Sequence, residues 1–253
     1  MSDSGDAGNA STHRDLVREA GVRLRYFPVD LNDAQLPLVL LVHGFGASYQ
    51  HNWVQTGWVR ALNAAGRSSI GLDLRGHGSS GKPHDPDAYL PERHVADLAA
   101  VLDDCAAEQV DVVAYSMGSR MTWELLRSCP GRVRRAVLAG FGPYSAPRVA
   151  GHEEAGSSAE ALAAASALPG NDPKALTACQ QGEARHPFTV DPVPEQVALL
   201  FAAGSYDTIA GGMEELAERV PAAQSMWVAG RNHRNAVAAR ALKTEALRFL
   251  AQP

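Results

Sequence analysis

The 253-residue sequence has few of the features that mark membrane, secreted or nucleic-acid-binding proteins. No apolar run approaches the roughly 20 residues that span a bilayer. The segment 1–15 is polar, small and acidic, which predicts a flexible tail and not a signal peptide. The net charge is -5 and no basic cluster is present, which argues against a nucleic-acid surface. We therefore expect neither a membrane nor a nucleic acid among its partners.

Cysteine is also scarce, with only Cys105, Cys129 and Cys179 in the chain. Three widely spaced cysteines indicate neither a disulfide framework nor a zinc site. Because disulfides are rare in reducing compartments, this usage predicts a cytoplasmic protein. We expect no metal and no cofactor.

The chain does contain the hydrophobic patterns of a globular domain, with 45% hydrophobic and 20% charged residues. Continuous apolar runs and an initial alternating stretch predict strands, and the segments between them have helical periodicity. Strands that alternate with helices predict an α/β fold: a mostly parallel central sheet of about eight strands, flanked by helices. The predicted strands lie in a hairpin at 16–29 and at 38–42, 69–74, 110–115, 133–139, 197–203 and 225–229. The predicted helices lie at 58–65, 94–107, 121–127, 212–220 and 240–250.

The pattern changes between residues 141 and 195. Glycines and prolines, Pro173 among them, interrupt it, although the alanine-rich stretch 158–168 predicts a helix. A segment of about 55 residues is too long for an idle loop and is typical of a lid. We therefore predict a short cap inserted after the sixth strand, with residues 16–140 and 196–253 forming the core and 1–15 the tail.

The stretch around Ser116 carries the strongest chemical signal. It follows the apolar run Val110–Tyr115 and precedes a helical pattern, with the small residues Ala114 and Gly118 on either side. This arrangement predicts a sharp strand-to-helix turn that exposes the hydroxyl, close to the G-x-S-x-G pattern. The helix N-terminus there would favour developing negative charge. Ser-x-Gly triplets are common, so the alternative is an incidental serine, and the rest of the chain has to decide.

A neutral serine needs a base to take its proton and a carboxylate to orient that base. Two loops after late strands supply both, since Asp207 follows the strand at 197–203 and His233 follows the strand at 225–229. The carboxyl ends of parallel strands meet at one edge of a sheet, so these groups are expected to converge. Asp191 is a rival acid, but it lies among prolines before the strand, and we favour Asp207.

These pieces occur together and in order, each at the end of a predicted strand. The sequence thereby resembles the α/β-hydrolase superfamily, in its serine-nucleophile, esterase- or lactonase-like branch. The matched pieces are His43-Gly44-Phe45-Gly46, the run 73–79, the turn Ala114–Gly118, Asp207 and His233. The resemblance implies that Ser116 is the nucleophile, His233 the general base and acid, and Asp207 the orienting acid.

The same resemblance implies the groups around the triad. The backbone N–H groups of Met117 and Phe45 would form the oxyanion hole. His43, Asp73 and Arg75 are expected to brace loops and not to transfer protons. The expected substrate pocket contains Gly44, Phe141, Tyr144 and Phe188, while Trp53 and Trp58 are either pocket or core residues.

The identity of the nucleophile restricts the chemistry. Haloalkane dehalogenases and epoxide hydrolases of this fold use aspartate at the elbow, so Ser116 argues against both. Serine peptidases of the fold carry acidic anchors for a substrate amine, but the context of Glu153, Glu154 and Glu183 does not match. We expect a serine hydrolase that cleaves a small or medium carboxylic ester or lactone through an acyl-enzyme, with a small molecule as its substrate. Hydrolysis of a carbon–carbon bond, perhydrolysis, a lyase reaction and a catalytically weak ligand-binding role stay open.

Overall fold

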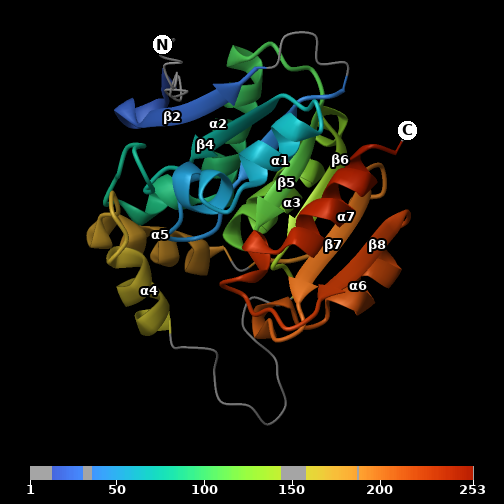
Figure 1. Cartoon of the computed structure of the whole chain (residues 1–253). Helices are drawn as coiled ribbons and strands as arrows, with labels where there is room; N and C mark the ends of the chain where they lie inside the picture. Colours follow the sequence, from blue (N-terminus) through green and yellow to red (C-terminus); the bar gives the residue numbers. More distant parts are fainter. Residues whose placement is uncertain (1–12, 31–35, 144–157, 187, 253) are drawn as a thin grey trace, which may run out of the picture.

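The computed structural model describes residues 13–30, 36–143, 158–186 and 188–252. An eight-stranded sheet runs through it with helices on both faces (Figure 1), as the sequence predicts. The strands follow the spatial order β1-β2-β4-β3-β5-β6-β7-β8, and every pair from β4 to β8 is parallel. The strands are β1 (Arg14–Val17), β2 (Arg23–Val29), β3 (Val39–Val42), β4 (Ser69–Asp73), β5 (Val110–Tyr115), β6 (Val133–Ala139), β7 (Ala198–Gly204) and β8 (Ala223–Val228).

The predicted hairpin is formed by β1 and β2, which are antiparallel to each other, and β2 is also antiparallel to β4. β1 begins at Arg14, so the first two residues of this strand belong to the sheet and not to the predicted tail. Asp15 pairs with Arg25 across the hairpin at 2.8 Å. Residues 1–12 of the predicted tail lie outside the described residues.

The central strands are buried on both faces of the sheet. All four residues of β3 and all six of β5 are buried, which is the reason why β3 is apolar throughout and β5 is apolar except for Asp111. The buried Asp111 carboxylate pairs with Arg134 at 2.7 Å. Successive side chains point to opposite faces. Leu40 therefore joins one hydrophobic cluster and Leu41 joins the other.

Two helical layers cover these clusters. Helices α1 (Trp58–Ala64) and α7 (Arg240–Leu250) pack on the face that contains Leu41. Helices α2 (Pro91–Asp104), α3 (Met117–Ser128) and α6 (Met213–Arg219) pack on the face that contains Leu40. Among the described residues, no helix is both long enough and apolar enough to cross a membrane.

The segment between β6 and β7 contains two helices, α4 (Ser158–Ser166) and α5 (Pro173–Arg185), which lie side by side in Figure 1. The sequence pattern predicts α4 but not α5, because a proline such as Pro173 often interrupts a helix. Pro173 is instead the first residue of α5, a position where its missing N–H has no cost. The Asp172 side chain caps this helix by accepting the Lys174 N–H at 2.8 Å. The division into core and cap stays a prediction.

Candidate active site

Ser116 lies in the turn between β5 and α3, with φ 54° and ψ -117°. Such a positive φ is strained for a residue with a side chain. Its N–H donates to the Ala139 carbonyl oxygen at 2.8 Å, which holds the turn against β6. Gly118 lets α3 approach the end of β3, because a Cβ there would lie 2.2 Å from the Val42 carbonyl oxygen. Ala114, opposite Val42, is fully buried inside β5, so a methyl group fits where glycine is usual.

Three of the predicted site residues form one hydrogen-bonded chain. His233 Nε2 lies 2.9 Å from Ser116 Oγ, and His233 Nδ1 lies 2.9 Å from Asp207 Oδ2. The Asp207 side chain is buried and also accepts the Ile209 N–H at 3.0 Å, so its orientation is fixed. A proton on Nδ1, held by the carboxylate, leaves Nε2 free to accept the serine hydroxyl proton. Asp207 follows β7 and His233 follows β8, as their order in the sequence predicts.

The rival acid, Asp191, is placed elsewhere. Its side chain is exposed and pairs with Arg219 in α6, away from the imidazole. The structure therefore brings Asp207, and not Asp191, to His233.

Tyr115 is a further residue of the site, which no pattern in the sequence indicates. Its hydroxyl donates to the His233 carbonyl oxygen at 2.7 Å. Burial raises the pKa of Tyr115 above its ordinary value, so the phenol stays protonated and keeps donating. Gly140 makes room for this contact, since a Cβ there would lie 3.1 Å from both the His233 and Tyr115 rings. Only its place next to Ser116 in the sequence hinted at this role.

The loop after β3 lies directly against the serine. A Cβ at Gly44 would be 3.2 Å from the Ser116 Cβ, and the Gly44 N–H donates to Asn52 Oδ1 at 3.0 Å. Met117 is the first residue of α3, where backbone N–H groups lack partners within the helix. Phe45 follows Gly44, and its ring packs edge-on against His77. The oxyanion role of the Met117 and Phe45 N–H groups stays a prediction.

The histidine and the aspartate expected to brace loops are buried and hydrogen-bonded to backbone. Both ring nitrogens of His43 have backbone partners. Nδ1 lies 2.8 Å from the Gly44 carbonyl oxygen, and Nε2 accepts the Leu74 N–H at 3.0 Å. Burial lowers the pKa of His43 to about 4, so the ring is neutral near pH 7. Asp73 accepts the N–H groups of Tyr49 and Ser79, which joins two loops.

The predicted pocket residues do not form one group. Phe141 is only 1% exposed and stacks on Phe201 in the core, so it is a packing residue. Trp53 and Trp58 are also core residues. Phe188 is partly exposed and touches Phe141 edge-on. Tyr144 lies outside the described residues. In the described part of the chain, no three His, Cys, Asp or Glu side chains are placed to hold a metal ion.

The chain also matches a known protein family. A family model of the alpha/beta hydrolase fold matches residues 37–162, which contain β3 to β6 and the turn at Ser116. The chain belongs to the α/β-hydrolase superfamily. Within it, epoxide hydrolase B of Mycobacterium tuberculosis is 35% identical over 128 residues, which are 51% of this chain and 35% of that protein. Epoxide hydrolase A of the same organism is 37% identical over 114 residues, covering 45% of this chain and 34% of that protein. This chain thus spans about a third of the length of these curated relatives.

Solved structures resemble this chain over almost its whole length. A hydrolase from Pseudomonas aeruginosa PA01 has a TM-score of 0.76 at 22% identity, covering 96% of this chain and 100% of that one. The enol-lactonase from Burkholderia xenovorans LB400 has a TM-score of 0.74 at 19% identity, covering 92% of this chain and 98% of that one. At such identities the likeness establishes the fold.

Proposed function

We propose that this protein is a serine hydrolase that cleaves a small or medium-sized carboxylic ester or lactone through an acyl-enzyme. The observation that carries the proposal is the unbroken hydrogen-bond chain from Ser116 through His233 to Asp207. This arrangement activates a hydroxyl that is otherwise a weak nucleophile at neutral pH.

In the first half of the reaction, Ser116 Oγ attacks the ester carbonyl carbon while His233 Nε2 takes the hydroxyl proton. Asp207 stabilises the imidazolium that forms. The oxyanion develops beside the start of α3, where the N–H of Met117 and that of Phe45 are proposed to bind it. Each such donor contributes about 3–4 kcal/mol to the stability of the transition state. The carbon–oxygen bond to the alcohol then breaks, and the alkoxide takes the proton from His233.

In the second half, water attacks the Ser116 acyl ester and gives its proton to His233 Nε2. The tetrahedral intermediate collapses, the acid leaves, and Ser116 Oγ recovers the proton. The same imidazole thus acts as a base and as an acid in each half, which requires access to both Ser116 and solvent. The His233 side chain is 25% exposed, so it meets both conditions.

The identity of the nucleophile favours acyl chemistry over epoxide hydrolysis. A carboxylate that opens an epoxide forms an ester, which water can hydrolyse to regenerate the enzyme. Ser116 would instead form an ether, which has no carbonyl for water to attack, and turnover would stop. The activity named for the mycobacterial relatives is therefore not proposed for this chain.

Replacing Ser116 by alanine tests the proposal. We expect the wild type to hydrolyse short aryl esters and Ser116→Ala to lose this activity, as measured by release of the aryl alcohol. A panel of lactones and a panel of thioesters are tested beside the aryl esters. Full activity in Ser116→Ala would overturn the mechanism. Product analysis separates the open alternatives, since a lyase releases an aldehyde or ketone and a binding protein releases nothing. The cytoplasmic location predicted from cysteine usage is likewise part of this proposal.

A further inference from the structure

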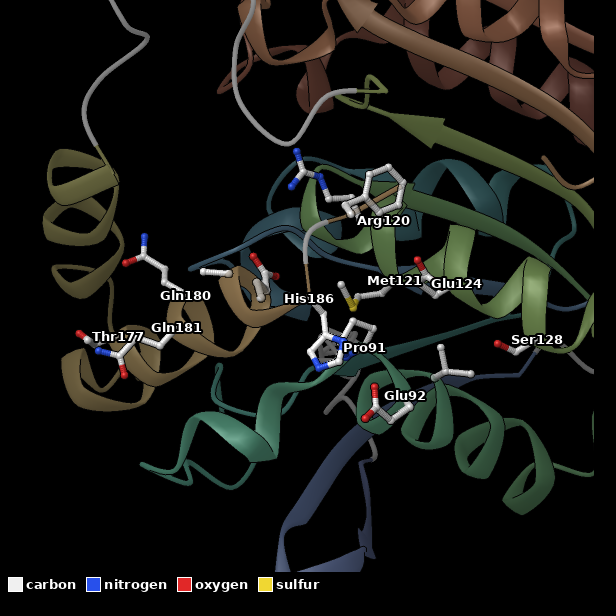
Figure 2. Close-up of a pocket in the computed structure, with 14 residues that line it drawn as sticks. Pro91, Glu92, Arg120, Met121, Glu124, Ser128, Thr177, Gln180, Gln181 and His186 are labelled. Atoms are coloured by element: carbon white, nitrogen blue, oxygen red, sulfur yellow. The ribbon is translucent and has the colours of Figure 1, made fainter. Parts of the chain in front are cut away.

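A cavity of about 940 Å³ lies between α2, α3 and α5 (Figure 2). This volume falls in the range of about 300–1,000 Å³ that is typical of small-molecule sites. Arg120 and Met121 of α3 line it, and the Arg120 N–H donates to the Ser116 carbonyl oxygen at 3.2 Å. The part of the cavity wall at Arg120 therefore lies one turn of α3 beyond the proposed nucleophile.

The lining combines apolar surface with an excess of negative charge. Val95, Met121 and Phe188 supply apolar side chains. Three carboxylates line the same cavity, one each from α2, α3 and α5, against a single guanidinium, that of Arg120. The three are Glu92, Glu124 and Glu183.

The three carboxylates differ in how their charge is compensated. Glu124 pairs with Arg127 at 3.3 Å on the same helix. Glu92 is exposed and lies in the first turn of α2, where the helix dipole favours a negative charge. Glu183 lies near the end of α5 and not in its first turn, and its Oε1 is buried without a hydrogen-bond partner, so only the nearby Arg120 offsets its charge.

Burial raises the pKa of Glu183 to about 7, and Arg120 opposes this shift only in part. The other titratable groups near Glu183 do not stabilise its charge. Cys179, on the same helix, interacts with it and is neutral, since burial raises the pKa of that thiol. Glu124 and Glu92 are carboxylates, and His186 is an exposed residue just after α5. A buried carboxylate oxygen without a hydrogen-bond partner is unfavourable, and a bound ammonium group would remove that cost with a charge-assisted hydrogen bond.

We propose that this cavity binds the part of the substrate beyond the scissile bond, and that Glu183 selects a substrate that carries a primary ammonium group there. The inference rests on the proposed function and names its substrate class: an amine-bearing ester or lactone. Glu183 is then a specificity-determining residue, while the triad remains the reacting machinery. The apolar side chains of the cavity would contact the linker between the ester and the ammonium group.

The test compares two matched series of aryl esters. One series is made from ω-amino acids of increasing chain length, and the other from acids in which a methyl group replaces the ammonium group. We expect wild-type kcat/KM to favour the amino series by roughly 10- to 100-fold at the best-fitting length, the range for a hydrogen bond to a charged group. Glu183→Gln keeps the shape of the side chain and should abolish the preference. Glu215→Gln is the control, because Glu215 is an exposed carboxylate of α6 that does not line the cavity, and it should keep the preference.

The pH dependence of this preference provides a second readout. As pH rises through about 7, Glu183 ionises and the ratio of kcat/KM between the two series should rise with it. Any effect of pH on the catalytic steps that the two series share cancels in the ratio. In Glu183→Gln the ratio should not change with pH.

Equal kcat/KM for the two series at every length would overturn the proposal, as would a preference that survives in Glu183→Gln. Unchanged labelling of Ser116 by a fluorophosphonate in Glu183→Gln shows that this variant is folded. If short esters are hydrolysed without any preference for an amine, the cavity proposal falls and the proposed function stands. If the wild type hydrolyses no ester, both fall.

Discussion

Two histidines of this chain, His233 and His94, illustrate opposite environments. Both ring nitrogens of His233 have partners, Ser116 on one side and Asp207 on the other, and the side chain is 25% exposed. His94 in α2 is fully buried, and neither of its ring nitrogens has a hydrogen-bond partner. Burial, together with the charge of Arg75, lowers the pKa of His94 well below its ordinary value. Partners and access to water make a histidine a proton carrier, whereas burial alone makes it a neutral packing residue.

The largest expected effect comes from breaking the partnership of His233. Asp207→Asn should lower kcat by about 10⁴-fold, because an amide can neither hold the required tautomer nor stabilise the imidazolium. Ester hydrolysis under saturating substrate measures this. Asp191→Asn is the control, since Asp191 pairs with Arg219 on the surface and should leave kcat unchanged. The reverse pattern would assign the acid to Asp191.

A smaller effect is expected from loosening the backbone of His233. Tyr115→Phe removes the hydrogen bond from the phenol to the His233 carbonyl oxygen and leaves the ring in place. One hydrogen bond contributes about 0.5–1.5 kcal/mol, so we expect kcat to fall about 2- to 10-fold while KM stays the same. Tyr206→Phe, at a 73% exposed residue of the neighbouring loop, is the control. A loss of thermal stability with unchanged kcat would mean that Tyr115 only supports the fold.

The smallest effect concerns His94 and should appear in stability and not in activity. The pKa of His94 is lower in the folded chain than its ordinary value of 6.5, so the unfolded chain binds more protons below that pH. The folded state therefore loses stability as pH falls below about 6.5. His94→Leu removes this contribution, up to about 2 kcal/mol at pH 5. Urea unfolding at pH 7 and pH 5 should show a smaller decline for His94→Leu than for the wild type. An identical decline would exclude His94 as a source of acid sensitivity.

The fold and the proposed triad can largely be predicted from the sequence, because the patterns that indicate them are local. Three patterns each indicate a strand end or a tight turn. They are the apolar run before Ser116, the small residue Gly118, and the order of Asp207 and His233. The proposed triad follows from them, since the ends of parallel strands meet at one edge. The role of Tyr115 was missed because its hydroxyl contacts a backbone atom 118 residues away, which no local pattern encodes.

The region between β6 and β7 was harder to predict. A proline can interrupt a helix or begin one, so Pro173 alone does not predict which. Only the neighbouring Asp172, which caps α5, distinguishes the two cases. Phe141 was assigned to the pocket because aromatic residues line pockets and cores alike, and the structure places it in the core. Glu183 was set aside on sequence context, yet α5 carries it into the cavity beside α3. These assignments depend on how distant elements pack.

The central claim is that His233 activates Ser116, and the rate of covalent labelling tests it most directly. A fluorophosphonate should modify the wild type rapidly and at one residue, Ser116, as located by peptide mass spectrometry. His233→Ala should be labelled far more slowly although Ser116 is present. Equal labelling rates in the two proteins, or an adduct on another residue, would contradict the account.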